Sequence, residues 1–410
     1  MERHLHRLDN GLTIVGEYSD AARTLAAGYF VRTGSRDETR EVSGVSHFLE
    51  HMMFKGTAHR SPEDVNREFD EIGARYNAFT SEEATVYYGN VIPQFQDRLL
   101  DLLSDMMRPA LRDEDFDMEK NVILEEIAMY QDKPHFVVFD LARETYYRNH
   151  PLGASILGSP DSIKQLSREQ MHTYFTNRYA ANNLTLVLTG KYDWDAAVTQ
   201  IETLCSGWNT ADAPRALSPL QALPQTKVEK TDQFNRAHIM LMAPGFAAQD
   251  ERRCAAVVAC EAIGAEDGSR LYWELIHPGL AEAAQAGHDA NDGDGVYYGY
   301  VLCDPYKASE VLQAFRHVVR KACDEGLSIE EVERAKRRLA SHLVLGAETP
   351  MGRLRAVGMD WLYRREQKTP AESLQKVLAV TPEEVNAVLA LHPFERATTV
   401  ALGPVEKLTA

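Results

Sequence analysis

Apolar and polar positions in the first half of the chain follow two periods, and together they predict alternating groups of strands and helices. Strands show an apolar run or a two-residue alternation bounded by turn residues, whereas helices show apolar residues at three- and four-residue spacing. Ser61 followed by Pro62 predicts a helix start, with serine as cap and proline at the first helical position. The remaining expected elements are a hairpin over 5–17, a strand over 25–33, two strands within 75–91, and helices over 95–107 and 113–131.

One predicted helix, which ends near Gly56, is apolar almost all round. Its polar exceptions are His47, Glu50 and His51, among the apolar neighbours Val45, Phe48, Leu49, Met52, Met53 and Phe54. A helix of this kind is buried, and buried imidazoles and carboxylates need partners. The alternative is a surface helix with two solvated histidines, and the apolar neighbours argue against it.

The spacing of these three residues is typical of a metal site. His47 and His51, four apart, share one helix face, and Glu50 lies beside them. Two imidazoles are preferred zinc ligands, and a catalytic zinc takes three protein ligands plus water. A carboxylate beside that water can take its proton. The order H-x-x-E-H is the inverzincin signature, so we expect His47 and His51 to bind zinc and Glu50 to act as base.

The helix expected over 113–131 carries two acids on its apolar side. With Glu119 at zero and about 100° per residue, Glu126 falls at about −20°. Apolar residues flank both acids, on one side Phe116, Ile123, Ile127 and Tyr130, and on the other Met118, Val122 and Met129. Buried carboxylates are costly without a cation. We therefore predict Glu126 as third zinc ligand and Glu119 as a residue that orients the site; the alternative is pairing with buried Arg or Lys.

Length and composition restrict the remaining possibilities. A chain of 410 residues is expected to form two domains of about 200 residues each. The net charge of −17 argues against nucleic acid as a partner and is compatible with a basic peptide substrate. No apolar run approaches the roughly 20 residues that span a bilayer, and no signal peptide is evident. Five cysteines without a C-x-x-C motif fit reduced thiols, so we expect a cytoplasmic protein without membrane association.

A short predicted strand follows the second helix and consists of side chains of modest size, Asn77, Ala78, Phe79 and Thr80. An edge strand beside a protease site can hold a peptide through backbone hydrogen bonds. We name these four residues as the candidate substrate-binding strand. The alternative, which periodicity alone favours, is an ordinary hairpin arm.

Several of these motifs together resemble the pitrilysin and mitochondrial processing peptidase family of zinc proteases, in particular its short two-domain members. The resemblance rests on residues 47–51 (HFLEH) and 119–127 (EKNVILEEI), with further similar runs at 77–81 and 150–158. It implies that Glu126 completes a site for one zinc ion per chain and that Glu119 assists catalysis. It also implies halves that close around short or unfolded peptides, like a clamshell.

The second half of the chain repeats the first. The run TVYYG at 85–89 returns as GVYYG at 295–299, an offset of 210 (297 − 87), and a looser echo at offset 216 (336 − 120) follows. Such an offset indicates two copies of one fold. Long runs of strands and of helices indicate α+β domains with mainly antiparallel sheets. We predict a catalytic domain over 1–212, a linker over 213–225 and a non-catalytic homologous domain over 226–410.

The predicted second copy departs from the chemistry of the first. Ala335 and His342 stand where Glu119 and Glu126 are expected, and no H-x-x-E-H occurs there. After the run 268–275, Ile276 and Glu282 stand where the family resembled has a substrate-holding arginine and tyrosine. We therefore expect a dimer, with a preference for a heterodimer whose homologous partner supplies the arginine and tyrosine, and a homodimer as the alternative.

Two histidines in the same region, His277 and His288, could contact substrate, but we interpret them as surface residues. The sequence as a whole predicts a zinc endopeptidase. Two alternatives stay open: a non-catalytic assembly subunit of a related complex, and a binding module with a structural zinc. The second would need a closed site of four ligands and would leave Glu50 without a role.

Overall fold

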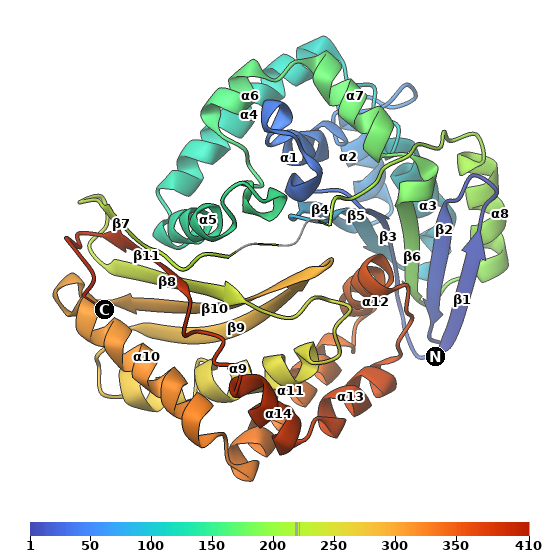
Figure 1. Cartoon of the computed structure of the whole chain (residues 1–410). Helices are drawn as coiled ribbons and strands as arrows, with labels where there is room; N and C mark the ends of the chain where they lie inside the picture. The colour runs from blue at the N-terminus through green and yellow to red at the C-terminus, as the bar shows by residue number, and fades with distance from the viewer. Residues whose placement is uncertain (218–219, 221, 410) are drawn as a thin grey trace. The chain divides into compact units, whose positions relative to one another are not determined.

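The computed structural model describes residues 1–217, 220 and 222–409 and divides the chain into two compact units (Figure 1). Pro219, within the expected linker, lies outside the described residues. Unit 1 comprises 1–128, 154–216 and 346–369, and unit 2 comprises 129–153, 217–345 and 370–410. The units are interleaved in the sequence, whereas we expected each half of the chain to form one domain.

Unit 1 is built on a six-stranded sheet with the order β1-β2-β6-β3-β5-β4. The expected hairpin and strands are confirmed: the strands are β1 (Glu2–Arg7), β2 (Thr13–Tyr18), β3 (Leu25–Val31), β4 (Arg75–Thr80), β5 (Thr85–Val91) and β6 (Leu184–Gly190). All pairs are antiparallel except β2 with β6. The longer helices are α1 (Val45–Met52), α2 (Pro62–Glu71), α3 (Gln96–Met106), α4 (Asp113–Gln131), α7 (Arg168–Arg178), α8 (Trp194–Cys205) and α12 (Pro350–Arg364).

Strand β3 is wholly buried because the sheet of unit 1 is covered on both faces. Alternate residues of a strand point to opposite faces. Tyr29 and its alternates join the core formed with α1 and α3, whereas Ala26 and Phe30 pack with Leu354 and Val357 of α12. Unit 1 therefore has three layers, in which a single helix from late in the sequence covers the second face.

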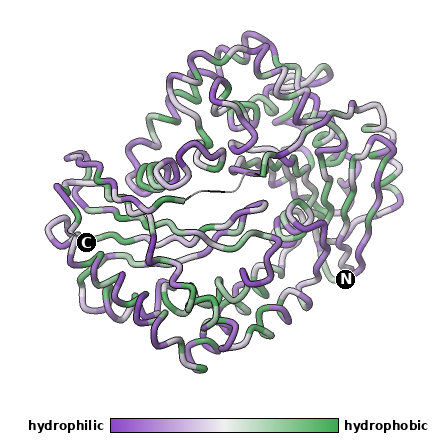
Figure 2. Tube along the Cα trace, in the orientation of Figure 1, coloured by the Kyte–Doolittle hydropathy of each residue, from purple (hydrophilic) through white to green (hydrophobic). Residues whose placement is uncertain are grey.

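Unit 2 repeats this plan with five strands in the order β7-β11-β8-β10-β9. The strands are β7 (Thr226–Lys230), β8 (Ala237–Pro244), β9 (Ala283–Asn291), β10 (Asp294–Cys303) and β11 (Thr398–Gly403). The longer helices are α5 (Pro134–Tyr147), α9 (Arg253–Gly264), α10 (Ala308–Glu325), α11 (Ile329–Gly346), α13 (Pro370–Ala379) and α14 (Pro382–Leu389). Figure 2 shows hydrophobic residues along the strands and an alternation of hydrophobic and hydrophilic residues along helices such as α10.

In unit 2 the second face of the sheet is covered by α5, a helix from early in the sequence. Val138 and Ala142 of α5 pack against Met240 of β8 and Val400 of β11. The repeated YYG run occupies the same place in both sheets, since β5 lies between β3 and β4, and β10 lies between β8 and β9. These observations confirm the expected α+β class with two sheet-and-helix units. No described helix combines the length and the apolar content that crossing a bilayer requires.

Candidate metal centre

Helix α1 carries the H-x-x-E-H residues of unit 1. It begins after Gly44, and Val45, Phe48, Leu49 and Met52 are buried, as expected for a helix apolar on most sides. His47 is also buried, with 8% of its surface exposed. The helix packs against β4, β5 and α7. Burial on three sides fixes the direction in which the two imidazoles and Glu50 point.

Helix α4 supplies the two expected acids, but its apolar arc is only partly buried. Glu119 is 3% exposed, and Phe116, Ile123 and Ile127 pack in the core of unit 1. Met118, Val122 and Met129 are instead 63%, 42% and 48% exposed. The prediction of an apolar arc buried on both sides of the acids was therefore wrong on one side. The Glu126 side chain, on the border between these two sides, is 23% exposed.

The structure brings the three expected ligands of unit 1 together. In the described part of the chain, only His47, His51 and Glu126 place three metal-binding atoms within 4.8 Å of one another. Oε2 of Glu126 lies 3.7 Å from Nε2 of His47 and 3.5 Å from Nε2 of His51. These separations are too long for hydrogen bonds. Ligands about 2.1 Å from a tetrahedral zinc lie about 3.4 Å apart, so the donor set and its spacing fit that ion.

Glu119 lies behind His51 and contacts its other ring nitrogen. Nδ1 of His51 lies 2.8 Å from Oε1 of Glu119, and Nζ of Lys55 lies 2.5 Å from Oε2. A carboxylate on the second nitrogen of a histidine fixes the ring and directs the first nitrogen at the metal. Glu119 therefore also pairs with Lys55, as the alternative interpretation of paired acids expected. Glu126 instead faces the two imidazoles.

The pKa values of the two imidazoles shift in opposite directions. Burial lowers the pKa of His47 to about 3, with a smaller contribution from the charge of His51. His47 is therefore neutral, which is the form that binds a metal. Burial also lowers the pKa of His51, but its hydrogen bond to Glu119 and the charges of Glu126 and Glu119 outweigh burial and raise the pKa above its ordinary value.

Glu50 lies on the same helix and contacts the edge of the sheet. Oγ1 of Thr80 donates a hydrogen bond of 2.5 Å to Oε2 of Glu50. Burial raises the pKa of Glu50, the Thr80 hydrogen bond and the charge of His51 lower it, and the charge of Glu126 raises it; the net shift is upward. The charges of two candidate ligands, His51 and Glu126, therefore act on Glu50, and its pKa is shifted upward, the direction that favours accepting a proton.

The expected substrate strand is β4, which stands last in the order of its sheet and pairs with β5. Along it, Asn77 is exposed, Ala78 is buried, and Phe79 and Thr80 are partly buried. Ala78 and Thr80 share the face that carries the contact to Glu50, and Asn77 and Phe79 lie on the other. An edge strand that ends at Glu50 has the placement that peptide addition requires; its use for substrate stays a prediction.

The region of unit 2 expected to lack the substrate pair has its own contacts. Glu282 forms an ion pair with Arg236, 2.5 Å apart. His277 is exposed, as expected. His288 is only partly exposed: its Nε2 accepts a hydrogen bond of 2.9 Å from the backbone N–H of Phe246, its ring packs against Phe246 and Tyr297, and burial lowers its pKa to about 4. For His288 the surface interpretation therefore holds only in part.

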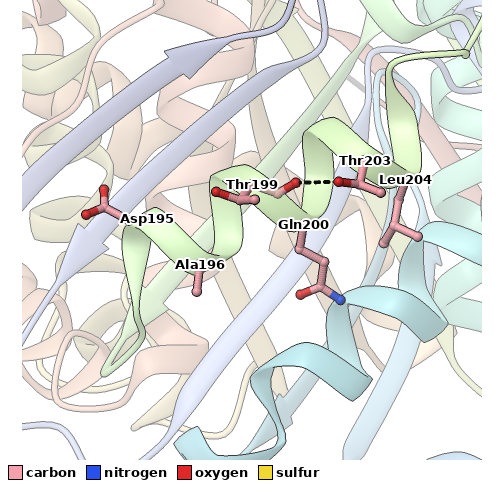
Figure 3. A pocket seen from close by; sticks show the side chains of 6 residues that line it. All are labelled: Asp195, Ala196, Thr199, Gln200, Thr203 and Leu204. Atoms are coloured by element: carbon pink, nitrogen blue, oxygen red, sulfur yellow. Dashed lines mark hydrogen bonds between the residues drawn. The ribbon is translucent and has the colours of Figure 1, made fainter.

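A surface hollow of about 570 Å³ lies on α8 and shares no residue with the candidate metal centre (Figure 3). Its lining residues are Asp195, Ala196, Thr199, Gln200, Thr203 and Leu204. Figure 3 shows them along successive turns of this one helix, with no cluster of acids or histidines among them. The hollow adds no chemistry to the site.

Sequence reasoning missed two contacts of the site residues. Lys55 follows His51 by four residues, and this spacing could have indicated a cation on the same side as Glu119. Thr80 was named for the strand alone, and its bond to Glu50 joins residues 30 apart, which no local pattern reveals. Both contacts depend on how α1, α4 and β4 meet.

Comparison with known proteins agrees with this geometry. The family model of insulinase (Peptidase family M16) matches residues 13–160, and that of the peptidase M16 inactive domain matches residues 165–339. An uncharacterized zinc protease of Streptomyces coelicolor is 32% identical, with 92% of this chain and 84% of the relative covered. One of Bacillus subtilis is 30% identical, with 92% of each chain covered. The beta subunit of the mitochondrial-processing peptidase of Neurospora crassa is 28% identical, with 92% of this chain and 83% of the relative covered.

Solved structures share the fold. A protease from Helicobacter pylori superimposes with a TM-score of 0.92 at 19% identity, covering 98% of this chain and 99% of that one. A peptidase M16 inactive domain from Pseudomonas fluorescens gives a TM-score of 0.91 at 17% identity, covering 100% and 99%. The two family models and the relatives named as zinc proteases support the class of metalloproteases. The chain belongs to peptidase family M16.

Proposed function

We propose that this chain is a zinc-dependent endopeptidase that cleaves short or unfolded peptides enclosed between its halves. The observation that carries the proposal is the convergence of His47, His51 and Glu126, whose metal-binding atoms lie within 4.8 Å of one another. The two imidazoles and the carboxylate would hold one zinc ion. When bound there, zinc would polarise a peptide carbonyl and lower the pKa of water.

The other residues of the site serve proton transfer and orientation. Glu50 takes a proton from the attacking water and passes it to the leaving amine. Thr80 holds the Glu50 carboxylate through the hydrogen bond to Oε2. Glu119 holds the ring of His51, and Lys55 balances the charge of Glu119. Each role uses a contact of unit 1.

Substrate would bind as an added strand on β4. Residues Asn77 to Thr80 form the end strand of the sheet, and backbone hydrogen bonds hold a peptide without reading much of its sequence. The contact between Thr80 and Glu50 would bring the bound backbone next to the base. This mode favours extended, unfolded segments as substrates.

The proposed assembly is a dimer, with preference for a heterodimer, in which a homologous partner supplies the arginine and tyrosine absent at Ile276 and Glu282. The absence of an arginine and a tyrosine at these two positions supports the proposal; Glu282 pairs with Arg236 within unit 2. Native mass spectrometry of the purified chain, alone and with a homologous subunit, would measure it. A fully active monomer would contradict the proposal.

A cytoplasmic location is part of the proposal and is supported by the five cysteines, all described and all free thiols. Two other functions fit the site less well. A structural zinc would need a fourth protein ligand, and a non-catalytic subunit would have no use for Glu50 in contact with Thr80.

The substitution Glu50→Gln tests the catalytic role. We expect it to lower kcat about 100- to 10,000-fold on a fluorogenic peptide mixture, with one zinc ion per chain retained, because general base catalysis contributes on this order. Glu125→Gln, an exposed acid of α4 next to Glu126, is the matched control and should leave kcat unchanged. An unchanged rate in Glu50→Gln would refute the role of Glu50.

A further inference from the structure

Helix α1 begins at a residue that has no side chain to cap it. The first N–H groups of a helix have no partner within the helix, and a polar side chain at the preceding residue usually accepts one of them. Here that residue is Gly44, with φ of +90°. A Cβ at Gly44 would lie 2.6 Å from the backbone oxygen of Leu157, so the close approach requires glycine. The acceptor for the first turn must come from elsewhere.

Glu38 supplies it from six residues upstream. The backbone N–H of Gly44 donates a hydrogen bond of 2.7 Å to Oε2 of Glu38, and the N–H of Ser46 donates one of 2.8 Å to Oε1. Both oxygens of one carboxyl group thus accept a hydrogen bond from N–H groups at the start of α1, those of Gly44 and Ser46. The positive end of the helix dipole favours an acidic group at this place.

Ser46 is held a second time, through its side chain. Its Oγ lies 2.7 Å from the hydroxyl of Tyr174 on α7, and that hydroxyl lies 2.7 Å from Oγ1 of Thr33. The next residue along the helix is His47. The ends of a helix fray most readily. Here the first turn is fixed through both the backbone and the side chain of Ser46, the residue immediately before a candidate metal ligand.

The segment that presents Glu38 is itself fixed by buried ion pairs. Arg215 donates bonds of 3.1 and 2.7 Å to the two carboxylate oxygens of Asp37, the residue before Glu38. Arg36 forms an ion pair with Glu83, and both side chains are at most 2% exposed. Paired and hydrogen-bonded charges at this depth allow little movement of the backbone that carries them.

The same segment also contacts the connection that follows β4, the strand whose Thr80 bonds to Glu50. Glu83, the partner of Arg36, follows Thr80 by three residues in the connection from β4 to β5. One short stretch, residues 36–38, therefore contacts the start of α1 on one side and the connection that follows β4 on the other. The relative placement of the imidazoles, Glu50 and Thr80 depends on both contacts.

Unit 2 offers a contrast at the matching place. Helix α9 follows β8 as α1 follows β3, and at the offset of 210 the residue matching Glu38 is Ala248. The residue that precedes α9, Arg252, makes no side-chain cap. Its backbone N–H donates one hydrogen bond of 2.9 Å to Oδ1 of Asp250, two residues upstream, whereas at α1 one carboxyl group accepts from the N–H groups of both Gly44 and Ser46.

We propose that Glu38 is a positioning residue of the metal centre, which fixes the first turn of α1 and thereby the direction of His47, Glu50 and His51. This inference rests on the proposed function. Without the two bonds to Gly44 and Ser46, the first turn would loosen, His47 would sample more directions, and metal would bind more weakly. Substitutions behind a metal ligand lower affinity about 10- to 100-fold.

The test uses Co²⁺ as a visible probe on the full-length chain freed of metal. Glu38→Leu keeps the approximate shape and removes both acceptors, whereas Glu38→Gln keeps one. We expect Glu38→Leu to weaken Co²⁺ binding about tenfold, to change the visible spectrum of the bound ion and to lower kcat more than it changes KM. Glu38→Gln should fall between Glu38→Leu and the wild type in all three measurements.

The control is Asp193→Leu, which removes the side-chain cap that Ala196 N–H uses at the start of α8 in the same unit. It should lower stability by about 1 kcal/mol and leave the Co²⁺ spectrum unchanged. Wild-type affinity, spectrum and kcat in Glu38→Leu, with loss of stability alone, would overturn the proposal. Should Glu38→Leu not fold, unchanged Co²⁺ binding in Glu38→Gln would do so. A wild-type chain that takes up no Co²⁺ would contradict the metal centre itself.

Discussion

The two units share one plan and differ in what their helices carry. At an offset of 216, α4 and α11 begin at matching residues (113 and 329), and α5 and α12 both begin at a proline, Pro134 and Pro350. Glu119 and Glu126 of α4 correspond to Ala335 and His342 of α11. Ala335 is buried without a polar group, whereas Glu119 is buried in contact with His51. The plan of the fold is thus independent of the chemistry, which resides in a few side chains.

The largest expected effect comes from the pair Glu126 and His342. Glu126→Gln should weaken zinc binding about 100- to 1000-fold, because one of the protein ligands is lost and structural zinc sites draw on the order of 3 kcal/mol from each ligand. His342→Gln, at the matching place in α11, should change nothing. Chelator competition measures the zinc affinity of both variants. An equal loss of affinity in the two would contradict the proposal that only α4 supplies a metal ligand.

The exchanged helices differ in the charge at one position near their starts. Arg353 of α12 donates two hydrogen bonds, 2.6 and 2.7 Å long, to the carboxylate of Glu17 on β2, and Val137 stands at the matching place in α5. Arg353→Leu leaves a buried carboxylate unpaired and should cost about 3 to 5 kcal/mol of unfolding free energy. Urea unfolding measures it, and the double variant with Glu17→Leu should recover most of the loss. A small effect in the single variant would show that Glu17 finds water instead.

A smaller effect concerns the fit of each exchanged helix on its sheet. Gly358 of α12 packs so closely on Phe30 that a Cβ would lie 2.2 Å from the ring, whereas α5 has Ala142 at the matching place. Gly358→Ala should cost about 1 to 3 kcal/mol through overpacking. Ala142→Gly should cost about 1 kcal/mol through backbone entropy. Thermal unfolding of both variants measures the two losses of stability. Stabilisation by Gly358→Ala would contradict the close contact with Phe30.

The last prediction is a pH dependence of stability that Glu38 gives to unit 1. Burial raises the pKa of Glu38 to about 8, although the hydrogen bonds from Ser46 and Gly44 oppose the shift. When the pKa of a carboxyl group is higher in the folded chain than in the unfolded chain, the folded chain loses stability as pH rises from the lower pKa through the higher one. The stability advantage of the wild type over Glu38→Gln should therefore shrink between about pH 5 and pH 8, by up to about 1.4 kcal/mol for each unit of pH. A constant difference across this range in urea titrations would contradict the shift.

The sequence predicted the strands, the main helices and the candidate ligands because these depend on local pattern. The hairpin, β3 and the two-residue alternation follow from neighbouring residues, and the ligands follow from four- and seven-residue helical spacing. The repeat at offset 210 predicted the equivalent places of β5 and β10. The exchange of α5 and α12 between units could not be predicted, since helical periodicity shows that a face is apolar but not which sheet covers it.

The side chains that support the site were the least predictable part. Thr80 and Glu38 act through contacts with α1 that join residues 30 and 6 to 8 apart. The exposure of Met118 and Val122 on α4 also depends on which neighbours pack against the helix. A helical wheel gives directions around one axis, and only tertiary packing decides which direction is covered.

The central claim is that His47, His51 and Glu126 bind one zinc ion with Glu50 beside it. A crystal structure of the zinc-loaded chain, with data collected on both sides of the zinc absorption edge, tests this most directly. We expect one anomalous peak per chain within about 2.0 to 2.2 Å of Nε2 of His47, Nε2 of His51 and a carboxylate oxygen of Glu126. A peak elsewhere, or a Glu126 side chain turned away from both imidazoles, would contradict it.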